Sequence, residues 1–104
     1  MAESILKVPQ SREVRVRLDI DADRIETVKL VVVPRANDLV EIDLERHVLG
    51  FIERAGQVFV ALAGERLDRA EECGQSLLWD HAAAELVRKA RIDQARADRV
   101  SLSA

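Results

Sequence analysis

Cys73 and His81 are the side chains in this sequence that most resemble a nucleophile and its base. A cysteine attacks as the thiolate, which a helix N-terminus or a nearby cation favours. Cys73 precedes a predicted helix, but Glu71 and Glu72 beside it oppose its ionisation. A single cysteine is more typical of a small buried hydrophobic residue. We therefore predict no catalytic residue, and keep an enzyme or small-ligand site around Cys73 and His81 as an alternative.

Metal-binding side chains do not form a complete set in the sequence. His47 and His81 are the only histidines, whereas a zinc site needs three or four ligands close together. Three carboxylates alternate like the start of a calcium loop, at Asp19, Asp21 and Asp23. Arg24 stands where such a loop requires glycine, and no glycine-rich phosphate motif is present. We predict no metal and no cofactor.

Trp79 and His81 are the predicted residues of a protein interface. A single tryptophan at the start of a helix is most typical of a core anchor, but a partly exposed one is a frequent interface hot spot. His81 follows it on the same predicted helix. The expected partner is a second copy of the chain or another protein.

The end of the chain is basic, unlike the rest. Residues 1–87 carry 11 basic and 17 acidic side chains, a net charge of −6, whereas residues 88–104 carry 5 and 2, a net charge of +3. The five basic residues are Arg88, Lys89, Arg91, Arg96 and Arg99. They would spread around a helix rather than form one stripe, which is typical of a solvated surface. Contact with nucleic-acid phosphates is the alternative.

Composition predicts one small domain with an aliphatic core. The chain has 104 residues, of which 48% are hydrophobic and 3% aromatic. So few rings argue against a base-stacking platform. One cysteine excludes an internal disulfide, and neither a secretory signal nor a membrane-length apolar run is present. We expect a cytoplasmic protein without membrane contact, and the 13 arginines against 3 lysines suggest a bacterial gene.

A helix is the most clearly predicted element, over Ser76–Ala90. Ser76 is suited to cap its first turn. The residues after it are mostly strong helix formers, and the apolar ones recur at steps of three and four. We expect the helix to continue to about Arg99 and to leave residues 101–104 as a loose tail. Residues 1–11 are expected to be a flexible lead-in, and residues 12–100 a single domain.

Strands are predicted before that helix. Glu13–Ile20 alternates apolar and charged residues, which is typical of a half-buried strand. Ile25–Val33 is rich in β-branched residues, which indicates a central strand covered on both faces. We expect Pro34 to end that strand, and Leu67–Cys73 to return as a short edge strand or to be irregular.

Residues 38–56 fit two patterns. Val40, Ile42 and Leu44 alternate with acidic residues, as in a strand, and Val48–Arg54 would then be a second strand. Asp38 could instead cap a helix over residues 39–55 that ends at Gly56. We favour the strands. The predicted fold is α+β, an antiparallel sheet of four to five strands with the C-terminal helix on one face, and ββαβα is the alternative. We expect a non-enzymatic interaction or accessory module that forms a homodimer.

Overall fold

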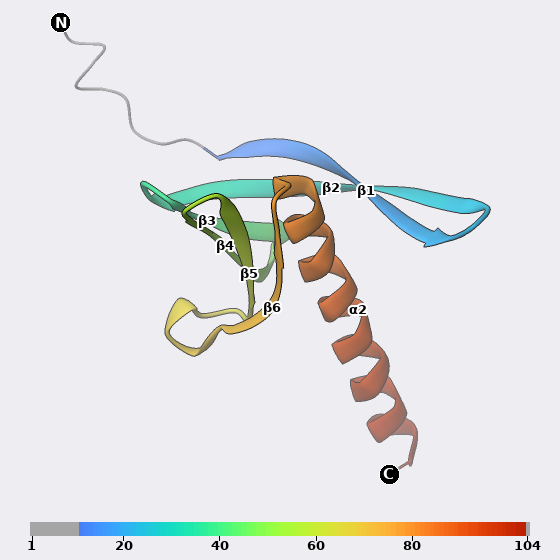
Figure 1. Cartoon of the computed structure of the whole chain (residues 1–104). Coiled ribbons are helices and arrows are strands. Elements are labelled where there is room, and N and C mark those ends of the chain that lie inside the picture. The colour runs from blue at the N-terminus through green and yellow to red at the C-terminus, as the bar shows by residue number, and fades with distance from the viewer. Residues whose placement is uncertain (1–10, 104) are drawn as a thin grey trace, which may run out of the picture.

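The computed structural model describes residues 11–103, which form six strands followed by one long helix (Figure 1). The strands are β1 (Arg12–Asp21), β2 (Arg24–Ala36), β3 (Leu39–Leu44), β4 (His47–Ala55), β5 (Val58–Ala63) and β6 (Glu71–Ser76). A short 3-10 turn, η1 (Leu67–Arg69), precedes β6, and the helix is α2 (Trp79–Ser103). The α+β class is therefore confirmed, with six strands instead of four or five. The predicted lead-in lies almost wholly outside the described residues.

The sheet is a simple meander in which every strand pairs antiparallel with the next. The Asp21 carboxylate closes the first hairpin by accepting a hydrogen bond of 2.9 Å from the Asp23 backbone N–H, as short acidic turns favour. The far half of this hairpin projects as a two-stranded ribbon, because β3 pairs with β2 only from Val31 onward (Figure 1).

Residues 38–56 are strands, so the alternative helix over residues 39–55 is wrong. Glu45 and Arg46 join β3 to β4 with φ angles of 49° and 70°, the left-handed conformation that a tight hairpin turn demands. Close packing explains why residue 50 is a glycine. A Cβ atom at that position would lie 2.1 Å from the Leu62 carbonyl oxygen and 2.9 Å from Leu86 Cδ2.

Pro34 does not end β2, contrary to the prediction. The strand continues through it to Ala36, and Pro34 pairs with Val40 of β3. On its other side, the described part of β1 pairs no further along β2 than Val32. The missing N–H of the proline therefore costs no ladder hydrogen bond to β1, which is the edge situation in which sheets tolerate proline.

Ser76 is the last residue of β6 and not the helix cap. Its hydroxyl oxygen accepts a hydrogen bond of 3.0 Å from the Leu78 backbone N–H, which shapes the turn that leads into α2. The helix starts at Trp79 and continues to Ser103, so Ser101–Ser103 are helical and not a tail.

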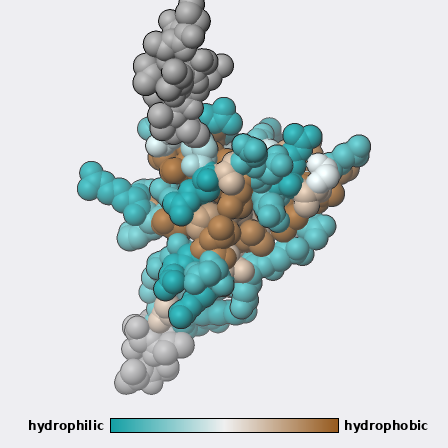
Figure 2. Space-filling model, turned by 90° about the vertical axis from the view of Figure 1, so that its left-hand side faces the viewer, coloured by the Kyte–Doolittle hydropathy of each residue, from teal (hydrophilic) through white to brown (hydrophobic). Residues whose placement is uncertain are grey.

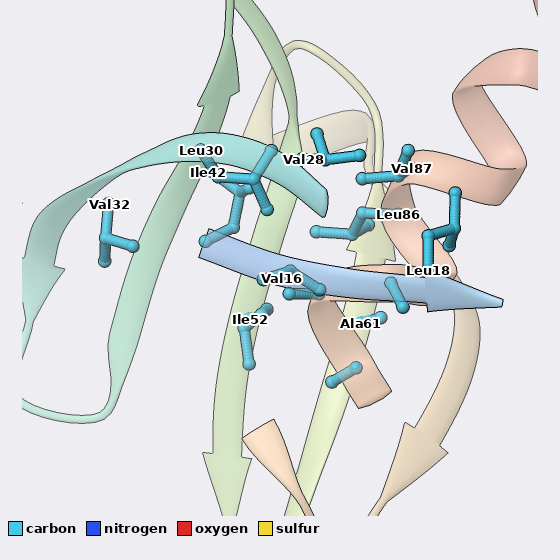
Figure 3. Close-up of a cluster of buried hydrophobic side chains, with 13 residues drawn as sticks. Val16, Leu18, Val28, Leu30, Val32, Ile42, Ile52, Ala61, Leu86 and Val87 are labelled. Carbon is cyan, nitrogen blue, oxygen red and sulfur yellow. The ribbon is translucent and has the colours of Figure 1, made fainter. Parts of the chain in front are cut away.

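Helix α2 packs its first half on one face of the sheet, which we call the inner face (Figure 3). Three consecutive alanines, Ala82, Ala83 and Ala84, let the helix approach the strands closely, while Leu86 and Val87 fill the space beyond them. Alternate residues of a strand point to opposite faces, so every second residue contributes to this core. The sheet residues of the core are Val16, Leu18, Val28, Leu30, Val32, Ile42, Ile52 and Ala61. Residues 91–99 of the helix are exposed, and its C-terminal part extends away from the sheet (Figure 1).

Candidate protein interface

Trp79 and His81 lie on different sides of α2. Trp79 is half-buried against the core and, with Phe59 and Val40, lines a small hollow of about 160 Å³. His81 is exposed beside a groove of about 420 Å³ between β1 and α2, whose rim includes Arg17 and Glu85. Two residues apart on a helix differ by about 200° in direction. The structure therefore does not bring the two predicted interface residues into one surface.

Cys73 is poorly suited to nucleophilic chemistry. It lies in β6, half-buried, and its side chain packs against the core. Burial raises the pKa of its thiol, and the nearby Glu85 carboxylate raises it further. The protonated thiol is the less reactive form. The environment of Cys73 thus resembles that of a structural cysteine.

Three of the five basic residues near the C-terminus already have carboxylate partners. Arg88 pairs with Glu85 at 2.9 Å, and Lys89 pairs with Asp93 at 3.1 Å. Arg91 reaches across to Glu26 of β2 through two hydrogen bonds. Arg96 and Arg99 are exposed and have no ion pair within the described residues. The charge available to nucleic-acid phosphates on α2 is therefore smaller than the sequence indicates.

Within residues 11–103, no group of three or more histidine, cysteine, aspartate or glutamate side chains is placed to hold a metal ion. The same part of the chain contains no helix with both the length and the apolar character needed to cross a bilayer.

The other face of the sheet, which we call the outer face, carries a second set of hydrophobic residues. The pairing register places Val33, Glu41, Phe51 and Leu62 side by side in one row across four strands. Cross-strand partners share a face of the sheet, so the neighbouring rows follow directly. The central residues of the outer face are Val31, Val33, Glu41, Asp43, Val48, Phe51, Val60 and Leu62.

Phe51 and Val60 form the floor of the outer face. They are only 2% and 8% exposed, yet they do not belong to the hydrophobic cluster under α2. Val31, Val33 and Leu62 around them are half-buried. Figure 2 views the molecule from the side opposite α2 and shows apolar side chains gathered in its middle, framed by hydrophilic ones. The sheet is therefore apolar on both faces, while α2 covers only one.

Two carboxylates stand within this apolar surface. Glu41 and Asp43 are two residues apart on β3, so both point outward. The Glu41 side chain is 13% exposed and accepts a hydrogen bond of 3.0 Å from Arg35. Burial raises the pKa of Glu41, and the carboxyl group of Asp43 raises it further, against the opposing charge of Arg35. Asp43 Oδ1 is buried and has no hydrogen-bond partner.

The apolar outer face is not predicted by the sequence pattern of β3. Glu41 and Asp43 alternate with Val40 and Ile42, and that pattern predicts charged residues facing water. The available signal was the uninterrupted Leu30–Val33 run, which predicted a strand covered on both faces.

No known family model, curated protein or solved structure matches the chain.

Proposed function

We propose that this protein is a non-enzymatic interaction module that forms a homodimer through the outer face of its sheet. The observation that carries the proposal is the hydrophobic cluster around Phe51 on the side of the sheet opposite α2. A sheet with one solvated face normally places polar residues on that face, whereas apolar residues on both faces are typical of a sheet with a layer on each side.

The chemistry of the outer face fits a protein partner better than a small ligand. The surface combines aliphatic side chains and one phenylalanine with a few charged groups, as the centre of a protein interface does. Neither Glu41 nor Asp43 has a cysteine or histidine beside it on this face, so the two carboxylates lack the neighbours of a metal site or a catalytic site. A second copy is the simplest partner because one self-complementary patch is sufficient for a twofold dimer.

Light scattering after size exclusion and sedimentation velocity on the full chain test the proposal. Small interfaces bind weakly, so the protein should be followed from about 10 to 200 µM. We expect a dimer that dissociates on dilution. Val33→Asp and Leu62→Asp should shift it to monomer. Leu67→Asp is the matched control, since Leu67 is an exposed apolar residue of η1, 42% exposed and outside the outer face.

Two results would overturn the proposal. One is a wild-type protein that stays monomeric over the whole concentration range. The other is a dimer that tolerates both aspartates as well as it tolerates Leu67→Asp. Because Val33 lies on a central strand, Val33→Thr provides a milder variant of similar shape. Thermal unfolding of each variant shows whether a lost dimer reflects a lost fold.

A further inference from the structure

The outer face carries a second pair of like charges, of opposite sign to Glu41 and Asp43. Arg15 of β1 and Lys29 of β2 are directly opposite each other in the register. They lie on the outer face because Val31, two residues after Lys29, lies there too. Like charges directly opposite one another destabilise a sheet. The outer face therefore holds this basic pair as well as the acidic pair, in addition to Glu13, Glu53 and Glu72, which the register also places there.

Both pairs are incompletely neutralised within one copy. Lys29 approaches Glu13 at 3.8 Å, and Arg15 has no carboxylate partner among the described residues. On the acidic side, Arg35 binds Glu41, but Asp43 Oδ1 has no hydrogen-bond partner. A buried polar atom that lacks a partner is costly, and a cation that reaches it relieves that cost.

We infer that in the dimer Arg15 and Lys29 of one copy contact Glu41 and Asp43 of the second copy. This inference rests on the proposed dimer through the outer face. In a twofold dimer each contact occurs twice, so a face that holds both pairs neutralises both at once. Lys29 and Val33, which is opposite Glu41, are about 13 Å apart along β2. A twofold axis that lies in the interface and runs diagonally across β2 between them would bring the basic pair of one copy close to the acidic pair of the other.

Charge reversal in two separate chains tests this contact. The first chain carries Arg15→Glu and Lys29→Glu, and the second carries Glu41→Lys and Asp43→Lys. Each chain alone then carries charges of one sign at all four of these positions, and we expect its self-association to weaken at least about tenfold. Mixing the two chains restores opposite charges at both contacts. We expect a mixed dimer with an affinity within about threefold of the wild type.

The mixed dimer should be followed by sedimentation velocity and native mass spectrometry, at low and at high salt. Arg69→Glu and Glu65→Lys are the control substitutions, because they make the same charge changes at exposed positions outside the outer face. Controls that behave like the wild type are expected.

The possible failures are distinct. If both reversed chains dimerise as the wild type does, the charged contact is wrong, while Val33→Asp and Leu62→Asp still decide the outer face by themselves. If the reversed chains are folded but their mixture stays monomeric, the pairing is also wrong. A wild-type monomer at all concentrations overturns both the dimer and the contact.

Discussion

The two faces of this sheet are built from similar aliphatic residues, but they differ in the polar groups that lie among those residues. The inner face is closed by α2, and no polar or charged residue of the described chain is buried there. The outer face holds Phe51 just as deeply, yet places Glu41 and Asp43 beside it. The inner face is arranged for packing alone. The outer face retains groups that lower the stability of the isolated chain, which is a common property of binding surfaces.

The largest effect should come from the inner face, through Gly50→Ala. The added methyl group would meet the Leu62 carbonyl oxygen at 2.1 Å and Leu86 Cδ2 at 2.9 Å, so the backbone has to move. Overpacking of this kind costs about 3 kcal/mol. Urea unfolding measures the loss. Gly56→Ala is the control, because open space surrounds Gly56 and only its φ of 65° opposes a side chain, at about 1 kcal/mol. Equal losses for the two variants would contradict the packing argument.

Asp43→Val should separate stability from association on the outer face. The substitution removes a buried carboxylate oxygen that has no partner and introduces a β-branched residue, which suits a strand. We expect the free energy of unfolding of the monomer to rise by about 1 kcal/mol and self-association to weaken. Chemical unfolding at about 1 µM, where the protein should be monomeric, measures the free energy of unfolding. Sedimentation velocity measures self-association. A variant less stable than the wild type would show that Asp43 has an internal role.

Self-association should weaken as the pH falls. In the monomer, burial and Asp43 raise the pKa of Glu41, and only Arg35 of the same copy opposes them. In the proposed dimer, Arg15 and Lys29 of the second copy lower that pKa, so the dimer binds fewer protons. The dimer is then favoured above the raised pKa of the monomer and is lost as the pH falls below it, by up to about tenfold per unit of pKa difference for each of the two copies. Sedimentation between neutral pH and mildly acidic pH measures this dependence, and Glu41→Gln should flatten it.

The smallest effect is expected at Glu26, a carboxylate at the margin of the inner face. Its hydrogen bonds with Arg91 lower the pKa of Glu26, the opposite direction to Glu41. The resulting stability is present above the ordinary pKa of glutamate and is lost as the pH falls through the lowered value. Both side chains are exposed to water, so Glu26→Gln should reduce stability only slightly, and less at high salt. Urea unfolding in two salt concentrations checks this. A large loss would mean that the pair holds the ribbon on α2.

The sequence predicted those parts of the fold that local periodicity controls. Alternation over Glu13–Ile20 correctly placed Val16 and Leu18 on the buried side of β1. Asp21 and Asp23 after them form a turn of the kind that short acidic segments favour. Strand β6 was predicted only in part, because Glu71–Ser76 contains no β-branched or aromatic residue and owes its strand conformation to pairing with β5.

The candidate interface could not be predicted from local sequence patterns, because it depends on the pairing register of the strands. Phe51 reaches Glu41 only because the turn at Glu45 and Arg46 and the bulge after Ile42 fix how β4 lies on β3. The turn contains no Asn-Gly pair, so the sequence does not predict its left-handed geometry. A shift by one residue would have placed Phe51 under α2 instead. Trp79 and His81 were predicted as interface residues from their residue types alone. Their positions on α2 point them to different sides of the helix.

The meander also has a consequence for the speed and order of folding. Each strand closes a short loop with the strand just made, so the ladder can grow hairpin by hairpin with little chain entropy lost at each step. Helix α2 packs on β1 as well as on β4, β5 and β6, so it joins the two ends of the meander. We therefore expect the inner face to stay uncovered during folding until α2 has packed on it. We expect the three alanines of α2, which allow a close approach to the strands, to direct the helix to the inner face.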